Sequence, residues 1–263
     1  MLPNRLQKYL LKPLETDDKY SRGVVGFVTG SAEFPGAAIL GVTSAIRVGV
    51  GMVRYFGPDS VNSLVLESRP EVVCAPGRVT AWVLGSGVRS EESSRFEEAL
   101  ADELPKVIDA GCLEVFDVES LGGVCVLTPH AGEAAKLLTR LGFETTVEMV
   151  EADPEAIAKH IAFITGQTVC LKGNITIIAN AQGELVSVGP NPTDLATAGT
   201  GDVLAGIMGA LLAHHAGDFD PLDIAQTAVL IHTESARRLS AEGPIAALEL
   251  AEEVRSVVRD WRG

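Results

Sequence analysis

Aromatic and basic residues are scarce in this chain of 263 residues. Only 5% of the residues are Phe, Trp or Tyr, and 21 Lys and Arg stand against 35 Asp and Glu, for a formal net charge of −14 at pH 7. Such an acidic chain argues against nucleic acid and against an anionic membrane surface as partners. A phosphorylated ligand is still compatible with it, because local donors and a metal ion can reverse the sign of the charge at one site.

The chain also has few cysteines and no long apolar run. Its four cysteines are Cys74, Cys112, Cys125 and Cys170. None forms a C-x-x-C pair and most lie in apolar, strand-like runs, so we expect buried free thiols and no disulfide framework. No apolar run approaches membrane-spanning length, and the N-terminus lacks the apolar core and cleavage site of a secretory signal. We therefore expect a cytoplasmic protein without a membrane partner.

Short apolar runs that predict strands alternate with stretches that predict helices. The predicted strands are residues 24–29, 52–56, 81–84, 107–108, 124–127 and 168–171, and a hairpin of residues 175–180 and 184–188 follows them. The predicted helices are residues 35–48, a polar helix over about 91–104, and residues 132–141, 154–165, 202–215, 221–240 and 244–260. This order predicts an α/β protein with a mainly parallel sheet covered on both faces. Because no convincing linker interrupts the chain, we expect one domain over residues 1–263.

Small or polar residues follow several of the predicted strands. They are residues 30–31, residues 85–87, Asp109, His130 and residues 172–173. Since ligands bind such sheets beyond the carboxyl ends of the strands, the functional site is expected at this edge. Asp109 can assist a metal there or cap a turn. The other histidines show no metal-ligand spacing: His160, His214, His215 and His232.

The stretch 198–206 (AGTGDVLAG) predicts a glycine loop that leads into a helix. Gly199 and Gly201 let the backbone approach a ligand closely, and the N–H groups from Gly199 through Thr200 and Gly201 can hold phosphate oxygens. Asp202 would add negative charge beside bound phosphate, which is costly unless it serves as a general base on an attacking hydroxyl. The alternative is an ordinary acidic residue at a helix start.

Residues 128–133 (TPHAGE) join a predicted strand to a predicted helix. His130 and Glu133 are three positions apart, so both can face one side of the first turn. In one interpretation His130 contacts a ligand hydroxyl or phosphate and Glu133 holds a metal-bound water. In the other, Glu133 is the third-position partner of a helix cap.

Residues 172–176 (KGNIT) also follow a predicted strand. Lys172 can balance phosphate charge as a point cation, Gly173 permits a tight turn, and Thr176 offers a hydroxyl. The alternative is a solvated lysine at the start of an exposed hairpin. Residues 30–37 can shape a nucleotide-like pocket or form a plain connection, and residues 85–87 are a weaker glycine signal.

Taken in order, these segments resemble the ribokinase-like superfamily and, within it, the NAD(P)H-hydrate dehydratase family. The segments that carry the resemblance are residues 34–38 (FPGAA), 85–87 (GSG), 128–133 (TPHAGE), 172–176 (KGNIT) and 191–206, which ends in AGTGDVLAG. The last of these marks the superfamily. His130 stands where many sugar and vitamin kinases of the superfamily have Asn, and this points to the dehydratases.

The resemblance implies a three-layer α/β/α sandwich and a repair reaction. The hydroxyl of hydrated NADH or NADPH (NADHX or NADPHX) is phosphorylated from ADP or ATP, and phosphate then leaves to restore the dihydronicotinamide. The resemblance assigns the hydrate to Ala37, Gly87, His130 and Asp202. It assigns the adenine nucleotide to Lys172, Gly173, Asn174, Ile175, Thr176 and Gly201. It further implies Mg²⁺ bridging the phosphates, a homotetramer, and an epimerase on a separate chain.

The chain departs from the family pattern in two places. Arg89 stands where the second glycine-rich loop usually continues with Gly, and residues 193–195 (TDL) replace the usual Gly and Met. Asp194 therefore adds an acid near the expected phosphates. Two other functions stay open at this stage: a kinase that phosphorylates a vitamin precursor or sugar, and a nucleotide-binding module without catalysis.

Overall fold

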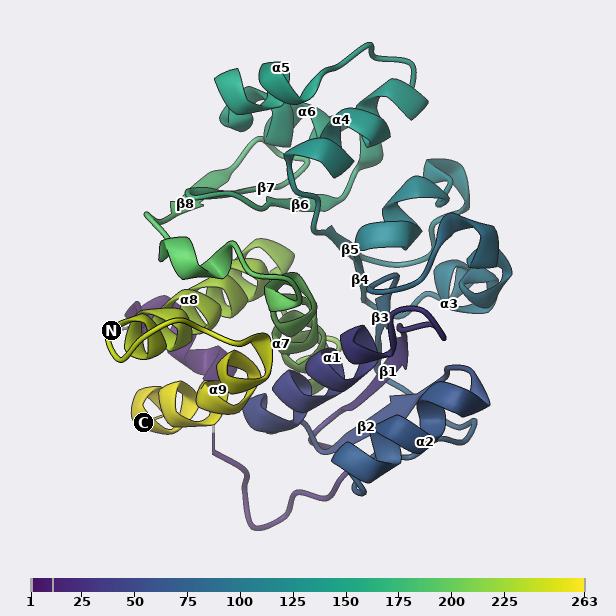
Figure 1. Ribbon diagram of the computed structural model, residues 1–263, viewed down its shortest axis with the longest axis vertical. Helices are drawn as coiled ribbons and strands as arrows, with labels where there is room; N and C mark the ends of the chain where they lie inside the picture. Colours follow the sequence, from purple (N-terminus) through teal and green to yellow (C-terminus); the bar gives the residue numbers. More distant parts are fainter. Residues whose placement is uncertain (1, 11, 263) are drawn as a thin grey trace.

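The computed structural model describes residues 2–10 and 12–262. Its strands form one eight-stranded sheet in the order β2-β1-β3-β4-β5-β6-β7-β8 (Figure 1). The strands are β1 (Val24–Val28), β2 (Met52–Tyr55), β3 (Ala81–Leu84), β4 (Lys106–Ile108), β5 (Cys125–Leu127), β6 (Thr168–Leu171), β7 (Thr176–Ala179) and β8 (Leu185–Val188). The strands from β1 to β6 pair in parallel, and β6–β7 and β7–β8 pair antiparallel. The predicted mainly parallel sheet and its terminal hairpin are confirmed.

Two groups of helices cover the sheet (Figure 1). On one face α1 (Pro35–Val48), α7 (Thr200–His214), α8 (Pro221–Ser240) and α9 (Ala247–Trp261) bury a core with inward residues of the strands, such as Val25 and Val83. On the other face α3 (Glu97–Ala101), α4 (Ala131–Arg140), α5 (Val147–Ala152) and α6 (Pro154–Thr165) pack on the alternate residues, such as Leu84 and Leu127. Alternate side chains of a strand point to opposite faces, so this pattern confirms the three layers.

The predicted polar helix over residues 91–104 is wrong as a continuous element. The segment is a 3₁₀ helix (Ser90–Arg95) followed by the short α3, and Glu92 leaves helical geometry at φ −95° and ψ 20°. Arg95 donates to the carbonyl oxygen of Gly30 at 2.9 Å. Phe96 is fully buried. These tertiary contacts outweigh the weak helix propensity of the serine-rich segment.

Two helices that the sequence analysis did not predict are present. The first is α2 (Asp59–Ser68), which buries only Val61 and Val65, and the second is α5, which buries only Val150. Such sparse apolar periodicity is too weak to stand out in the sequence. The signals that remain are the proline before Asp59 and the Thr146 side chain, which accepts from the Met149 N–H at the start of α5.

All four cysteines are free, and three of them, Cys112, Cys125 and Cys170, are buried as expected, while Cys74 is half-buried. Within residues 2–10 and 12–262, no helix combines the length and the apolar character that crossing a bilayer requires.

Helices α1 and α7 cross at unusually short range because glycine stands at the crossing. A Cβ built on Gly206 would lie 2.2 Å from the carbonyl oxygen of Gly41 and 2.2 Å from Ser44 Oγ. The Ser44 hydroxyl donates to the carbonyl oxygen of Val203 on α7 at 2.9 Å. This crossing holds the first turn of α7 in place beside the edge of the sheet.

We predict that Gly206→Ala destabilises the protein by about 1–3 kcal/mol, because the added methyl group forces the two backbones apart. Gly36→Ala is the matched control, since apart from its chain neighbours and the backbone of its own helix no described atom lies within 4 Å of a Cβ built there. It should change the free energy of unfolding by no more than about 0.5 kcal/mol. Urea denaturation of the two variants measures both values, and equal effects would show that the crossing is not tightly packed.

Candidate active site

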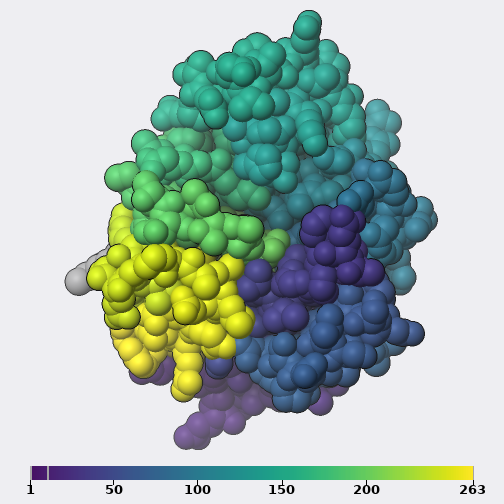
Figure 2. Space-filling view, viewed as in Figure 1, coloured from purple at the N-terminus to yellow at the C-terminus, as the bar shows by residue number. Residues whose placement is uncertain are grey.

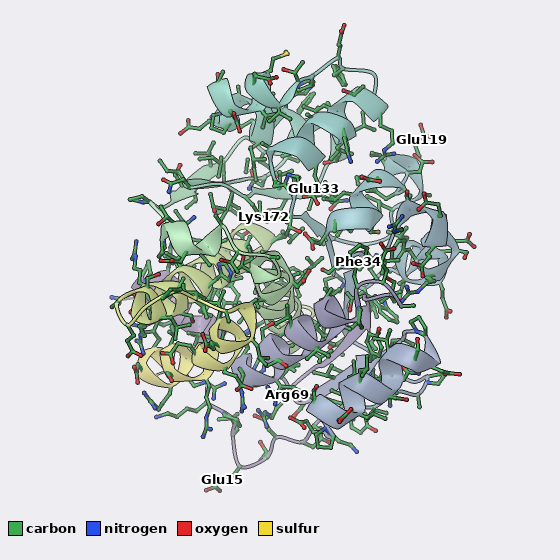
Figure 3. The ribbon with its side chains drawn as sticks, viewed as in Figure 1. Glu15, Phe34, Arg69, Glu119, Glu133 and Lys172 are labelled. Carbon is green, nitrogen blue, oxygen red and sulfur yellow. The ribbon has the colours of Figure 1, made fainter. Side chains whose placement is uncertain are left out.

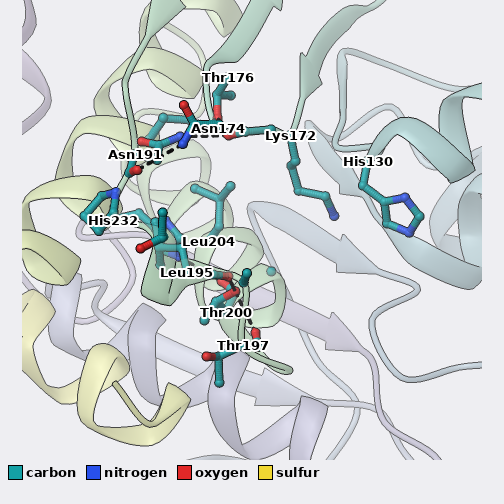
Figure 4. A pocket seen from close by; sticks show the side chains of 16 residues that line it. His130, Lys172, Asn174, Thr176, Asn191, Leu195, Thr197, Thr200, Leu204 and His232 are labelled. Atoms are coloured by element: carbon teal, nitrogen blue, oxygen red, sulfur yellow. Dashed lines mark hydrogen bonds between the residues drawn. The ribbon is translucent and has the colours of Figure 1, made fainter. Parts of the chain in front are cut away.

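A cavity of about 560 Å³ opens at the carboxyl edge of the sheet, between the hairpin β7–β8 and the first turn of α7 (Figure 4). Most of the residues predicted to bind the nucleotide line it, and so does His130. The lining residues that the sequence analysis had assigned to the site are His130, Lys172, Gly173, Asn174, Thr176, Thr200 and Gly201. Ile175 does not line the cavity, and the residue is 52% exposed.

A second cavity of about 400 Å³ lies on the other side of His130, which lines both. Phe34, Val88, Arg89 and Glu133 are among its lining residues. The space-filling view shows the surface hollowed between the teal segment that carries α4 and the purple segment before α1 (Figure 2).

The structure places Ala37 and Gly87 together at the wall next to this second cavity. Neither residue lines the cavity directly. A Cβ built on Gly87, whose φ is +65°, would lie 2.5 Å from the Cβ of Ala37 and 3.0 Å from the carbonyl oxygen of Phe34. Only glycine therefore lets the loop after β3 close against the start of α1.

Asp109 is the centre of a buried hydrogen-bond network, a role that the sequence analysis did not foresee. Its carboxylate accepts from Ser86 Oγ at 2.8 Å, from Thr128 Oγ1 at 2.8 Å and from Lys172 Nζ at 2.9 Å. Only 3% of its side chain is exposed. Burial by itself raises the pKa of Asp109, but the Lys172 charge and the three hydrogen bonds outweigh it and lower the pKa below its usual value.

Lys172 is not the solvated lysine of the alternative interpretation. Its side chain is 21% exposed, and its ammonium group lies 2.9 Å from Asp109 and 3.7 Å from Glu133 (Figure 3). Burial lowers the pKa of the amine, and the negative charges of Asp109 and Glu133 raise it by more, so the net shift is upward. Lys172 is therefore a fixed cation. A Cβ built on Gly201 would lie 3.6 Å from its Nζ, which places the cation against the first turn of α7.

Asp202 lies in the first turn of α7, half-buried, outside the set of residues that line the first cavity. Burial raises the pKa of its carboxyl group to about 7; Asp109 and Glu133 add to the rise and Lys172 opposes it. A carboxylate with a pKa near neutrality has the strength that a general base needs. The preceding Gly199, with φ +92°, is the N-cap, and a Cβ there would lie 3.9 Å from Asp202 Oδ2.

His130 and Glu133 form the helix cap that was one of the two interpretations. His130 Nδ1 accepts from the N–H groups of Gly132 at 3.0 Å and Glu133 at 3.3 Å, and Glu133 Oε2 accepts from the His130 N–H at 2.9 Å. The cap does not exclude a binding role. With Nδ1 held as an acceptor, the proton of the neutral ring is on Nε2, and the ring is 59% exposed between the two cavities.

Asn191 and His232 line the first cavity without having been predicted there. The Asn191 amide donates to the carbonyl oxygen of Gly173 at 3.0 Å and to Thr176 Oγ1 at 3.1 Å, and its carbonyl oxygen accepts from Thr233 at 2.7 Å (Figure 4). His232 Nε2 lies 2.9 Å from the carbonyl oxygen of Thr200. A carbonyl can only accept, so this nitrogen carries the proton. No spacing signal marks either residue, because their partners are distant in sequence.

The acidic side chains of the site bear on how Mg²⁺ could be held there. Within the described residues, no group of three or more His, Cys, Asp or Glu side chains is arranged to hold a metal ion. The oxygens of Asp109 already accept three hydrogen bonds, and those of Glu133 face His130 and Lys172. This donor set fits Mg²⁺ carried on nucleotide phosphates with most of its water shell, which is the usual mode for this ion, with Glu133 as acceptor for a metal-bound water.

Comparison with known proteins gives consistent results. A model of the family described as NAD(P)H-hydrate dehydratase matches residues 25–255. The ADP-dependent (S)-NAD(P)H-hydrate dehydratase of Neisseria meningitidis is 32% identical in an alignment that covers 93% of this chain and 86% of that protein. A bifunctional NAD(P)H-hydrate repair enzyme of Mycobacterium tuberculosis is 39% identical in an alignment that covers 76% of this chain. The match covers only 43% of that enzyme, so the chain spans less than half of its length.

Solved structures confirm the fold. The ADP/ATP-dependent NAD(P)H-hydrate dehydratase of Bacillus subtilis, co-crystallised with ATP and Mg²⁺, superposes with a TM-score of 0.86 at 26% identity, over 97% of this chain and 96% of that one. A ribokinase-like superfamily protein of Enterococcus faecalis superposes with a TM-score of 0.80 at 20% identity, over 97% of this chain and 94% of that one. The predicted ribokinase-like α/β/α sandwich is therefore confirmed.

The network around Asp109 leads to a prediction about stability. Asp109→Asn leaves the buried Lys172 ammonium with only the more distant Glu133 carboxylate, so we expect a loss of about 3–5 kcal/mol, and Lys172→Met should cost a similar amount by stranding the Asp109 carboxylate. The double variant should lose clearly less than the sum of the two single variants. Urea denaturation of all four proteins measures this coupling.

The exposed pair Lys136–Glu114 is the matched control, because it has the same 2.9 Å separation with 70% and 36% of the side chains exposed. Its coupling should stay within about 1 kcal/mol. If the buried pair coupled no more strongly than this exposed one, Asp109 would not be the organising group.

Proposed function

The chain belongs to the NAD(P)H-hydrate dehydratase family, and from this premise we propose that it removes water from hydrated NADH or NADPH in a reaction driven by an adenine nucleotide. The observation that carries the proposal is the Asp202 carboxyl group, which burial gives a pKa of about 7 beside the first turn of α7. We propose ADP as the donor, with ATP as the second choice, because the Neisseria relative is named ADP-dependent.

In the first step Asp202 takes the proton of the hydroxyl group on the hydrated ring. The hydroxyl oxygen forms a bond to the terminal phosphorus of the nucleotide, and the bond from that phosphorus to the bridging oxygen breaks, so that ADP leaves as AMP. In the first turn of α7 the N–H groups of Gly201 and Asp202 have no intrahelical acceptors, and they hold the transferring group, whereas the N–H of Thr200 donates to the carbonyl oxygen of Thr197 at 3.4 Å. The ammonium group of Lys172, beside Gly201, offsets negative charge in the same place.

In the second step the ring nitrogen pushes its lone pair toward the phosphorylated carbon, the carbon–oxygen bond breaks, and inorganic phosphate leaves. The C–H bond of the neighbouring ring carbon then breaks: its proton passes to the departing phosphate and its electron pair forms the ring double bond, which restores the dihydronicotinamide. This step needs little from the protein, because phosphate is already a good leaving group. The role of the protein in this step is to exclude competing water and to orient the ring next to Asp202.

The residue assignments belong to this proposal. The nucleotide occupies the first cavity against Lys172, Gly173, Asn174, Thr176 and Gly201. The family resemblance assigns Ile175 to the nucleotide as well, although this half-exposed residue does not line the cavity. The hydrate occupies the second cavity beside the wall formed by Ala37 and Gly87, and the His130 ring lies between the two ligands. Bound Mg²⁺ would supply charge neutralisation of the phosphates, held by them and by a water on Glu133.

Assembly and cellular setting also belong to the proposal. We propose a homotetramer of single-domain chains acting in the cytoplasm, with epimerase activity supplied by a separate chain. Size-exclusion chromatography with light scattering tests the assembly.

The function is tested by mixing the protein with Mg²⁺, hydrated NADH or NADPH, and either ADP or ATP. We expect the absorbance of the dihydronicotinamide ring to recover, faster with ADP, and to stop when EDTA removes Mg²⁺. Asp202→Asn should lower kcat by at least about 10²-fold, the lower end of general-base catalysis, and leave nucleotide affinity unchanged.

Each other outcome identifies a different function. Phosphorylation of a vitamin alcohol or sugar without recovery of the ring would show a kinase. Nucleotide binding without any turnover would show a binding module. A fully active Asp202→Asn variant would remove Asp202 from the mechanism.

The pH profile gives an independent test of the base. Only the ionised carboxylate can take a proton, so kcat/KM should fall about tenfold per pH unit below the pKa of about 7 and level off above it. Initial rates between pH 5 and 9 measure this limb in the free enzyme. A profile that stays flat down to pH 5 would mean that Asp202 has the ordinary pKa of an exposed carboxyl group.

A further inference from the structure

Arg89 lines the second cavity and is held there only loosely. Its Nη2 donates to Glu33 Oε1 at 2.6 Å, and its guanidinium carbon lies 5.8 Å from the centre of the Phe34 ring. The Arg89 side chain is 55% exposed and that of Glu33 54%. An ion pair this exposed contributes little, so a stronger anionic partner can replace Glu33.

Most of the donor capacity of Arg89 is unused. A guanidinium group carries five N–H donors, and within residues 2–10 and 12–262 the only side-chain hydrogen bond of Arg89 is the one to Glu33. The planar fork matches two phosphate oxygens at once, which makes Arg the preferred residue for phosphate recognition. The Phe34 ring, which also lines this cavity, lies on one side of the fork (Figure 3 labels Phe34).

Among the charged residues around the cavity, Arg89 is the cation that can most readily exchange its present partner for a ligand. The other charged residues that line it are Glu91, Glu114, Glu133 and Lys136. Lys136 is paired with Glu114 at 2.9 Å in a comparably exposed pair, but Glu114 itself lines the cavity, so releasing Lys136 would leave a carboxylate inside it. Glu133 is engaged in the helix cap and lies near Lys172. Glu33, the partner of Arg89, is not among the residues that line the cavity, so breaking that pair leaves no carboxylate stranded inside it.

We propose that Arg89 binds a phosphate group of the dinucleotide hydrate and sets the affinity of the second cavity for that substrate. The inference rests on the proposed function, since it takes the hydrate as the occupant of this cavity. The phosphate is either the pyrophosphate that both hydrates carry or the additional phosphate ester of the NADPH form. Arg89 exchanges its hydrogen bond to Glu33 for hydrogen bonds to that phosphate, and no covalent step is involved.

The test compares Arg89→Ala with Glu33→Gln, the variant that removes the competing partner. We expect Arg89→Ala to raise KM for the hydrate about tenfold or more, while kcat and the KM for ADP stay within twofold of wild type. The KM of Arg89→Lys for the hydrate should lie between those of wild type and Arg89→Ala. Glu33→Gln should keep the wild-type KM or lower it. If Arg89→Ala loses affinity for both hydrates, the group that Arg89 binds is the pyrophosphate. If it loses affinity for hydrated NADPH alone, that group is the additional phosphate ester.

Two results would overturn the proposal. One is an unchanged KM for both hydrates in Arg89→Ala. The other is an equal rise in KM in Glu33→Gln, which would show that the ion pair merely orders the loop. Circular dichroism of the variants checks that they fold.

A binding measurement separates this inference from the proposed function. NADH and NADPH are stable products of the proposed reaction, and their dissociation constants can be measured by fluorescence without any turnover. If wild-type protein turns over no hydrate but binds a reduced dinucleotide about tenfold more tightly than Arg89→Ala does, the function fails and the phosphate site stands. If wild-type protein and Arg89→Ala bind both dinucleotides equally, or wild-type protein binds neither, the phosphate site fails.

Discussion

The buried ion pair between Asp109 and Lys172 is the constraint on which the site depends. Asp109 directly follows β4 and Lys172 directly follows β6, and the other two partners of the carboxylate, Ser86 and Thr128, follow β3 and β5. One carboxylate thus ties together the ends of four neighbouring strands. Asp109 and Lys172 must stay paired, because removing either residue would leave the charge of the other buried without its main partner.

The pair also influences two neighbouring features, the first turn of α7 and the carboxyl group of Asp202. It fixes the Lys172 cation against the first turn of α7, where a Cβ on Gly201 would lie 3.6 Å from the amine. The negative charge of Asp109 adds to the burial of Asp202 and so helps to keep that carboxyl group near a pKa of about 7. The two aspartates therefore have opposite pKa shifts: the one bonded to Lys172 stays ionised, and the one without such a partner becomes a base of moderate strength.

The sequence predicted what local patterns encode. Alternating apolar runs predicted every strand, and the loop 198–206 was correctly placed at a helix start. The patterns failed where tertiary contacts decide: residues 90–101 break into two short helices, and α2 and α5 bury too few residues to show periodicity. The contacts of Asp109 and Asn191 join segments far apart in the chain, so no spacing rule finds them. The residue roles at the site stay predictions.

The charge at this edge of the sheet bears on how a polyphosphate could bind to a chain with a net charge of −14. Lys172 neutralises Asp109, and the Glu133 carboxylate accepts from the His130 N–H in the helix cap. With a pKa of about 7, Asp202 carries on average only part of a negative charge at neutral pH. The edge therefore repels phosphate weakly, yet it has no spare cation in the first cavity, because the one lysine that lines it is already paired. A nucleotide that brings its own Mg²⁺ meets this condition, whereas a nucleotide without the metal would have only backbone N–H groups and the Lys172 ammonium, whose charge Asp109 already largely compensates.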